Sequence, residues 1–314
     1  MRFKDFHGLQ ISRFGLGTVQ FGLNYGINNK TGQVGYDEVF AILSSARERG
    51  ITFVDTSRFY GTSEEVLGKA IHQLHAEDFF VVCTKLDLEK GYESRSDGEL
   101  CAEAEECLTK SLDALQLESI PLYLLHTEDY LSKDSVWEFV KEQKRTGRVR
   151  HIGVSVAVGP AGARLCLAHP EIEALQIAYN ALDGRWQKEG ILAEVEQRGI
   201  LLINRSSYLQ GLLLMERKDL PPNLAYGWEY LKRLSRFSEE SGIPLKELAL
   251  RYVFSIDTIA STIIGIDSRA QFDENYAIYE KGKLPEDLTH AIANAFTDTP
   301  EHLVNPALWG RPFP

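Results

Sequence analysis

Two side chains that can move a proton lie close together in this sequence. Asp55 follows the apolar run of residues 51–54, and Tyr60 comes five residues later. A short apolar run that ends in polar residues is typical of a buried strand that delivers side chains at its C-terminal end. A phenol in such a place, with a carboxylate nearby, indicates a proton donor.

Two further polar side chains, Lys85 and His126, follow the next two apolar runs. A lysine at the end of a buried strand needs an anion, and Asp55 on the neighbouring strand is the expected partner. The ammonium would then lie close to Tyr60. A nearby positive charge favours the phenolate, so we expect the pKa of Tyr60 to fall below its reference value of about 10. His126 could hydrogen-bond the same substrate oxygen.

Each of these four residues also has an ordinary structural explanation. Asp55 and Lys85 could form only a structural ion pair. His126 alone is more often a hydrogen-bonded core histidine, and Tyr60 alone could simply pack. The four together, at the ends of three consecutive strands, favour a proton-transfer site. Such a site can act as general acid towards a carbonyl oxygen or as general base towards an alcohol.

The elements that must position these residues alternate along the whole chain. Eight short apolar runs are separated by segments with apolar residues at three- and four-residue spacing. This alternation predicts a parallel sheet with helices outside, and eight strands favour a closed (β/α)8 barrel. The predicted strands are residues 14–18, 51–54, 79–84, 121–125, 149–154, 174–178, 200–203 and 261–264.

In a barrel of this kind the C-terminal strand ends meet at one mouth, where the chemistry is built. The glycine fingerprint of dinucleotide-binding open sheets is incomplete after the first strand. We expect one barrel domain over residues 1–314, with residues 1–13 as a hairpin that closes the N-terminal mouth. The tail from Thr297 is expected near the active-site mouth. Ser63 is expected to cap the helix that follows the tyrosine.

Composition excludes several classes of function. The 314 residues carry a net charge of −11, which argues against nucleic acid as a partner. No apolar run approaches the ~18 residues that a membrane-spanning helix needs, and the N-terminus has no apolar signal segment. The four cysteines form no Cys-x-x-Cys pair and the eight histidines are scattered, so no metal site is expected. We therefore expect a cytoplasmic protein with reduced thiols.

Short motifs follow one another from end to end of the chain. They are Gly15-Leu-Gly17-Thr18, Asp55-Thr-Ser-x-x-Tyr60-Gly-x-Ser63-Glu64, Lys85, His126, Gly153-Val-Ser155, Gln176-x-x-Tyr179-Asn180, Gln210-Gly211-Leu-Leu213, and Ile264-Gly265 with Glu274-Asn275. Together they resemble the aldo-keto reductase family. The resemblance implies a barrel enzyme that uses NAD(P)H to reduce the carbonyl of an aldehyde, ketone or sugar, or oxidises the alcohol. It also implies a catalytic quartet, which here is Asp55, Tyr60, Lys85 and His126.

The same resemblance implies contacts to the cofactor. Ser155 and Gln176 would hold the nicotinamide carboxamide, and Arg205 takes the place of the residue beside the ring. The adenine end would meet the segment after the last strand. The residues implied there are Gly265, Asp267, Arg269, Glu274 and Asn275. A helix capped by Ser268 would offer free N–H groups to a phosphate in that segment.

The sequence departs from the family pattern at the cofactor site. Val156 stands where the family usually has Asn, and Arg205 stands where an aromatic residue usually stacks on the nicotinamide. Asp267 would repel a 2′-phosphate, whereas Arg269 would attract one. Family habit places NADP(H) slightly ahead, and NAD(H) stays possible.

The expected substrate is a small carbonyl compound or alcohol at an aromatic-lined mouth. Its wall is predicted to include Gln20, Phe21 and Tyr25 after the first strand, with Trp309 or Phe313 from the tail. Phe21 and Tyr25 could equally pack against the barrel rim. An aromatic wall suits a sugar or an aromatic aldehyde.

A second hypothesis belongs to another class of protein. The barrel could bind a cofactor as a regulatory or structural subunit with weak or no turnover. Val156 and Arg205 favour this alternative, because they depart from the pattern of the active family. The complete quartet argues against it, because an idle site has no need of a buried lysine with its own carboxylate.

Overall fold

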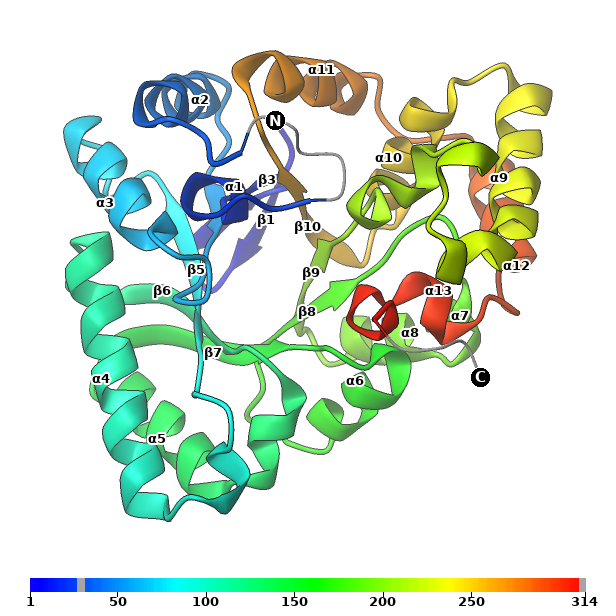
Figure 1. Ribbon diagram of the computed structural model, residues 1–314. Coiled ribbons are helices and arrows are strands. Elements are labelled where there is room, and N and C mark those ends of the chain that lie inside the picture. The colour runs from blue at the N-terminus through cyan, green and yellow to red at the C-terminus, as the bar shows by residue number, and fades with distance from the viewer. Residues whose placement is uncertain (27–31, 311–314) are drawn as a thin grey trace.

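The computed structural model describes residues 1–26 and 32–310. Eight parallel strands close into a barrel in the order β10-β3-β4-β5-β6-β7-β8-β9, with helices outside them (Figure 1). The predicted (β/α)8 barrel is therefore confirmed. The strands are β3 (Phe14–Gly17), β4 (Phe53–Asp55), β5 (Val81–Leu86), β6 (Ile120–Leu125), β7 (Val149–Ser155), β8 (Ala174–Ala178), β9 (Leu201–Arg205) and β10 (Ile259–Gly265).

Every predicted strand overlaps an observed one, and their ends differ by at most two residues. The largest shift is in β5, because Phe79 and Phe80 donate their backbone N–H groups to Ala76 in a turn. Parallel pairing with β4 begins only at Val81, which lies opposite Phe53. Lys85 consequently lies inside β5 and close to its C-terminal end.

The outer layer contains long helices with one buried face each. They are α2 (Tyr36–Glu48), α3 (Ser63–Gln73), α4 (Asp97–Leu115), α5 (Asp134–Arg145), α6 (Gly159–Leu167), α8 (Ile191–Gln197), α9 (Trp228–Ser241), α10 (Leu245–Ser255), α11 (Arg269–Glu280) and α12 (Glu286–Ala295). Shorter elements lie in the connections. They are α1 (Val19–Gly22), α7 (Arg185–Lys188), α13 (Glu301–Val304), η1 (Tyr92–Ser94), η2 (Glu128–Ser132), η3 (Leu209–Leu214), η4 (Arg217–Asp219), η5 (Pro222–Gly227) and η6 (Pro306–Leu308).

Helix α4 shows how the sequence specifies this outer layer. Leu100, Ala104 and Leu108 are spaced four residues apart, so they share one face, and all three are buried. The helix begins after Ser96, whose side chain accepts from the backbone N–H of Glu99 while the Glu99 side chain bonds back. This capping box satisfies free donors at the helix start.

The N-terminal hairpin closes one end of the barrel. β1 (Phe3–Phe6) pairs antiparallel with β2 (Leu9–Ser12), and the turn between them places Gly8 at φ 87°, which glycine adopts without strain. Phe6, Leu9 and Ile11 belong to the same buried cluster as barrel-interior side chains such as Phe53. The hairpin therefore covers the N-terminal mouth, as predicted.

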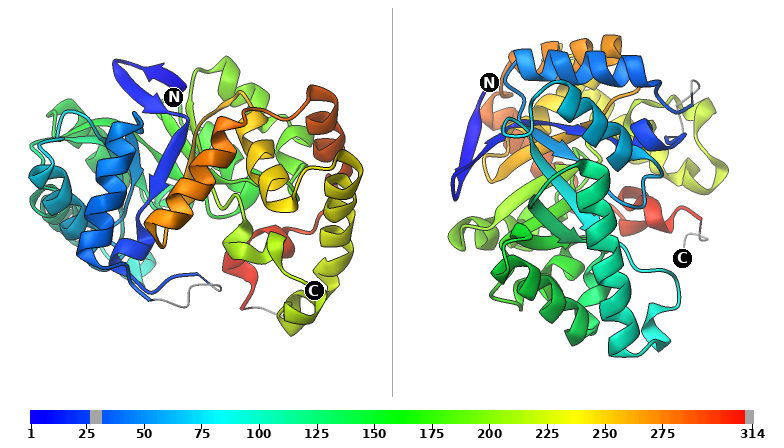
Figure 2. Two further views of the ribbon diagram at one scale, coloured as in Figure 1. Left: turned by 90° about the horizontal axis from the view of Figure 1, so that it is seen from above. Right: turned by 90° about the vertical axis from the view of Figure 1, so that its left-hand side faces the viewer.

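The C-terminal tail lies at the opposite end of the barrel from the hairpin (Figure 2, right). It folds as α13 and η6, and the Asn305 side chain donates to the carbonyl oxygen of Ala157, just beyond β7, at 3.0 Å. Trp309 turns back and donates its indole N–H to the carbonyl oxygen of Leu303 at 3.2 Å. Phe313 lies outside the described residues.

Candidate active site

Lys85 and Asp55 form a buried ion pair at the C-terminal end of the barrel. Lys85 is fully buried, and its Nζ donates to Asp55 Oδ1 and to the carbonyl oxygen of Thr56, both at 2.7 Å. Burial by itself lowers the pKa of Lys85, but the charge of Asp55, followed by that of Tyr60, outweighs burial and raises it. Lys85 is therefore a cation, held where the sequence predicted its partner.

Tyr60 lies directly beside this cation. The Lys85 Nζ atom is 5.1 Å from the centre of the Tyr60 ring. Burial nevertheless raises the pKa of Tyr60 above 10, and the opposing charges of Lys85 and Arg205 do not cancel it. The expected lowering is therefore wrong in direction, because loss of water around the phenolate outweighs the nearby cation. Tyr60 stays protonated at neutral pH.

The turn that carries Tyr60 is fixed by close backbone packing. Gly22 ends α1 so near this turn that a Cβ atom there would approach the carbonyl oxygen of Tyr60 to 1.8 Å. Ser63 donates its hydroxyl to the carbonyl oxygen of Thr18 at 2.8 Å. The predicted helix cap at Ser63 is wrong, because α3 starts at Ser63 with Thr62 as N-cap. The hydroxyl ties two loops together instead.

His126 follows β6 and completes the quartet in space. Its ring lies edge-on to that of Tyr60, with 6.1 Å between the centroids. Its Nδ1 atom is 2.6 Å from Oδ2 of Asp87, a residue that the sequence analysis did not single out. Asp87 comes two residues after Lys85, and side chains two apart in extended chain point to the same side. The spacing of two residues from Lys85 could therefore have identified Asp87 as a neighbour of the site.

Gln176 connects the quartet to the predicted nicotinamide contacts. Its Nε2 donates to Asp55 Oδ1 at 2.7 Å, and its Oε1 accepts from the Ser155 hydroxyl at 3.2 Å. The parallel register of β7 and β8 places Ser155 directly opposite Gln176. A hydroxyl and an amide beside the Asp55 carboxylate match the donors and acceptors of a carboxamide. These residues therefore fit the group implied for them.

Arg205 lies across the mouth from the end of β9. Its Nη2 donates to the carbonyl oxygen of Val156 at 2.9 Å, and Val156 itself is buried after β7. The charge of Arg205 also acts on Tyr60. The two departures from the family pattern are thus in direct contact.

The segment after β10 begins against Gln20. A Cβ atom on Gly265 would come within 2.7 Å of Gln20 Nε2, and the Gln20 side chain also hydrogen-bonds Asp267. The structure thus places Gln20 against the predicted cofactor segment, whereas we expected it in the substrate wall. Phe21 is fully buried in the core. Its assignment to an open pocket wall is wrong, because α1 packs it inward. Tyr25 is exposed and accepts a hydrogen bond from Gln210 at 3.1 Å.

Helix α11 starts as predicted, with Ser268 accepting from the backbone N–H of Gln271 at 3.2 Å. The backbone N–H of Arg269 donates to Glu38 Oε1 of α2 at 2.5 Å. The Arg269 guanidinium turns to Asp273, with its Nε 3.1 Å from Oδ1. The backbone N–H and the guanidinium of Arg269 therefore already have partners within the chain.

The two remaining predicted adenine contacts differ in burial. Asn275 is buried and accepts from the Tyr208 hydroxyl at 3.3 Å. Glu274 is exposed and lies 2.6 Å from Lys246 Nζ in an ion pair. Of these two residues, Asn275 is the one that faces the inner side of α11.

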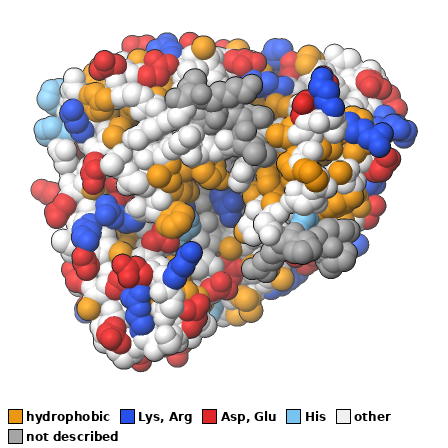
Figure 3. All heavy atoms as spheres, in the orientation of Figure 1, with side chains coloured by type: hydrophobic (Ala, Val, Ile, Leu, Met, Phe, Trp, Pro, Cys, Tyr) orange, Lys and Arg blue, Asp and Glu red, His pale blue; other side chains and the backbone are white. Residues whose placement is uncertain are grey.

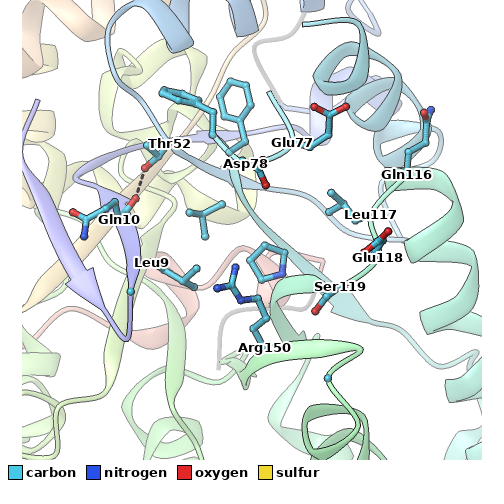
Figure 4. A pocket seen from close by; sticks show the side chains of 16 residues that line it. Leu9, Gln10, Thr52, Glu77, Asp78, Gln116, Leu117, Glu118, Ser119 and Arg150 are labelled. Carbon is cyan, nitrogen blue, oxygen red and sulfur yellow. Dashed lines mark hydrogen bonds between the residues drawn. The ribbon is translucent and has the colours of Figure 1, made fainter. Parts of the chain in front are cut away.

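The quartet and the predicted cofactor residues lie at the C-terminal mouth. Figure 3 shows this face, where hydrophobic side chains gather around a hollow near its centre. A separate cavity of about 790 Å³ lies at the opposite end of the barrel, beside the hairpin (Figure 4). Its described lining includes Leu9, Glu77, Leu117 and Arg150 and no member of the quartet. It is distinct from the candidate active site.

Two kinds of feature are absent from the described ranges 1–26 and 32–310. None of the helices there is long and apolar enough to cross a membrane. No group of three or more His, Cys, Asp or Glu side chains in the same ranges could hold a metal ion.

Known proteins match this chain over most of its length. The model of the Aldo/keto reductase family matches residues 13–295. The uncharacterized oxidoreductase YqkF of Bacillus subtilis (strain 168) is 26% identical over 298 residues, which cover 90% of this chain and 92% of that protein. L-galactose dehydrogenase of Arabidopsis thaliana is 25% identical, over 86% of this chain and 85% of that protein. The solved structure of aldo-keto reductase AKR11C1 from Bacillus halodurans, in its holo form, matches with a TM-score of 0.73 at 26% identity, covering 91% and 93% of the two chains.

Proposed function

This chain belongs to the aldo/keto reductase family, and on that premise we propose that it reduces the carbonyl of an aldehyde, ketone or sugar with Tyr60 as proton donor. It is an NAD(P)-dependent oxidoreductase. The observation that carries the proposal is the buried Lys85–Asp55 pair beside a phenol that burial keeps protonated. A protonated phenol next to a fixed cation suits proton donation to an oxygen that gains negative charge.

Each member of the quartet has a separate part in this proposal. Asp55 keeps Lys85 charged, and Lys85 stabilises the negative charge that Tyr60 acquires when it gives up its proton. His126, whose ring lies edge-on to that of Tyr60, would hold the substrate oxygen by a hydrogen bond and so orient it towards Tyr60. Cofactor nicotinamide, when bound, supplies the hydride, and Ser155 and Gln176 would hold its carboxamide.

The substrate class is a small carbonyl compound, and we favour a sugar. One relative is named L-galactose dehydrogenase, a dehydrogenase named for a sugar. Tyr25, exposed at the mouth, is also suited to pack against the apolar face of a sugar ring. The physical basis for the Trp309 contact is weaker, since its indole N–H is directed to Leu303.

The direct test is turnover of a general aldehyde. We expect the purified protein to oxidise NADH or NADPH when 4-nitrobenzaldehyde is added. The loss of cofactor absorbance measures this oxidation. Omission of the aldehyde is the control for cofactor breakdown. The proposal would be contradicted if the protein bound the cofactor tightly but oxidised it neither with this aldehyde nor with any of a panel of aldoses. That result would favour a regulatory or structural barrel.

We further propose that NAD(H) binds more tightly than NADP(H). This order is the opposite of the one that the family resemblance suggests. A 2′-phosphate at the start of α11 would have to displace the Glu38 carboxylate from the backbone N–H of Arg269. It would meet Asp267 in the loop before that helix, and the Arg269 guanidinium is already paired with Asp273. A free 2′-hydroxyl avoids these repulsions.

Fluorescence titration of the cofactors measures this preference. We expect a Kd for NADH at least about tenfold lower than for NADPH, a difference of about 1.4 kcal/mol. Glu38→Gln and Asp267→Asn should each lower the ratio of the Kd for NADPH to the Kd for NADH, because each removes a negative charge near the phosphate. Glu280→Gln, an exposed residue at the far end of α11, is the matched control and should leave it unchanged. Equal or tighter binding of NADPH by the wild type would refute the preference.

A further inference from the structure

The contact between Asp87 and His126 is the shortest polar contact of the histidine. Nδ1 lies 2.6 Å from Asp87 Oδ2 and 3.4 Å from the Ser57 hydroxyl. The Ser57 hydroxyl in turn lies 3.3 Å from the same Oδ2 atom, to which it donates. The backbone N–H of Phe59 donates to Ser57 Oγ at 3.1 Å. Oδ2 of Asp87 thus contacts both the ring nitrogen and the Ser57 hydroxyl, and the backbone of Phe59 fixes that hydroxyl.

The chemistry of the two groups determines which ring nitrogen carries the proton. An ionised carboxylate has only acceptor atoms, so at 2.6 Å the donor must be Nδ1–H of His126. A neutral imidazole has one proton on nitrogen, and its other nitrogen then presents a lone pair. Nε2 is that other nitrogen, and no residue in the described ranges forms a hydrogen bond with it.

We propose that Asp87 is a positioning residue that holds His126 as the Nδ1–H tautomer and directs Nε2 to the substrate oxygen. This inference rests on the proposed role of His126 in carbonyl reduction. In the neutral ring Nε2 accepts the hydroxyl proton of an alcohol in a hydrogen bond. Nε2 donates to a carbonyl oxygen only when the ring carries both protons, and Asp87 then faces the resulting positive charge.

The fold supports this pairing from two strand ends. Asp87 directly follows β5 and His126 directly follows β6, and the register of these strands places Leu86 opposite Leu125. The backbone N–H of His126 also donates to the carbonyl oxygen of Leu86 at 3.1 Å. Asp87 and His126 therefore lie at the same level along the barrel axis. Each follows its strand directly, so no long loop separates the carboxylate and the ring from the rigid barrel.

The tautomer is measured directly by ¹⁵N NMR of histidine-labelled protein. We expect wild-type His126 to show a protonated Nδ1 and an unprotonated Nε2 at a pH where the ring is neutral. Asp87→Asn should populate the Nε2–H tautomer, because the amide can donate to Nδ1 as well as accept from it. A wild-type spectrum dominated by Nε2–H would overturn the proposal, and this result needs no substrate and no variant.

Kinetics test the consequence for catalysis. Asp87→Asn should lower kcat for oxidation of the alcohol by about tenfold to a hundredfold, because the Nε2–H tautomer cannot accept the hydroxyl proton. This is the size of loss found when the outer hydrogen-bond partner of a functional histidine is removed, and the Kd for cofactor should stay unchanged. In a His126→Ala background the same change should have no further effect, since the two residues act as one unit. Additive losses, or an Asp87→Asn enzyme with wild-type kcat, would refute the positioning role.

Two comparisons separate this inference from the proposed function. Asp129→Asn, an exposed aspartate in η2 near the same mouth, is the matched charge control and should retain wild-type kcat and tautomer. If the wild type turns over no carbonyl compound, the proposed function fails, while the ¹⁵N spectrum still decides whether Asp87 selects the tautomer.

Discussion

Replacing Tyr60 by Phe is expected to lower kcat for carbonyl reduction by about 100- to 10,000-fold, the range typical of a lost general acid. The variant removes only the hydroxyl, and the turn that carries residue 60 is fixed by backbone contacts with Gly22 rather than by the phenol. The Kd for cofactor should therefore stay within a few-fold of wild type. Steady-state kinetics with an aldehyde, together with cofactor titration, measures both quantities.

The pH dependence of this loss follows from the burial of the phenol. Burial raises the pKa of Tyr60 above its ordinary value of 10.0, so the proton donor stays intact from neutral pH to about pH 10. The ratio of wild-type to Tyr60→Phe kcat should be constant over that interval, and should fall only at higher pH. Tyr36→Phe, which removes a phenol hydroxyl bonded to Gln73 on the outer helices, is the control. Full activity in Tyr60→Phe would show that another group donates the proton.

The largest effect on stability is expected from breaking the buried ion pair on one side only. Asp55→Leu leaves the fully buried ammonium of Lys85 without its carboxylate, and an unpaired buried charge typically costs about 3–5 kcal/mol. We expect a loss of this size in the free energy of unfolding, measured by urea denaturation with an unchanged m-value. The same variant should lack measurable carbonyl reduction.

The double variant Asp55→Leu with Lys85→Met separates stability from chemistry. Replacing both charges by apolar groups removes the unpaired charge, so most of the lost stability should return. Activity should not return, because no cation remains beside Tyr60. Equal destabilisation of the single and double variants would mean that the loss comes from packing around residue 55, not from the charge of Lys85.

The sequence predicted the barrel because its signals are local. Runs such as residues 174–178 are apolar over the length of one strand, and this run coincides with β8. Ser268 was recognised as a helix cap from its type and position alone. The positions of Asp55, Lys85 and His126 also followed from the pattern, because each comes at or directly after a predicted strand, and parallel strand ends meet at one mouth.

The sequence by itself thus determined the fold and placed Asp55, Tyr60, Lys85 and His126 at one mouth of the barrel. The tertiary structure alone decided how those side chains are tuned. The pKa of Tyr60 rises because the residues packed around the phenol exclude water from it. The spacing of residues along the sequence does not show how complete that exclusion is. Gln176 reaches Asp55 across 121 residues of chain, and the pairing of Asp87 with His126 depends on the relative height of two strands. Contacts of this kind are set by register and packing across the barrel, so the local sequence pattern cannot specify them.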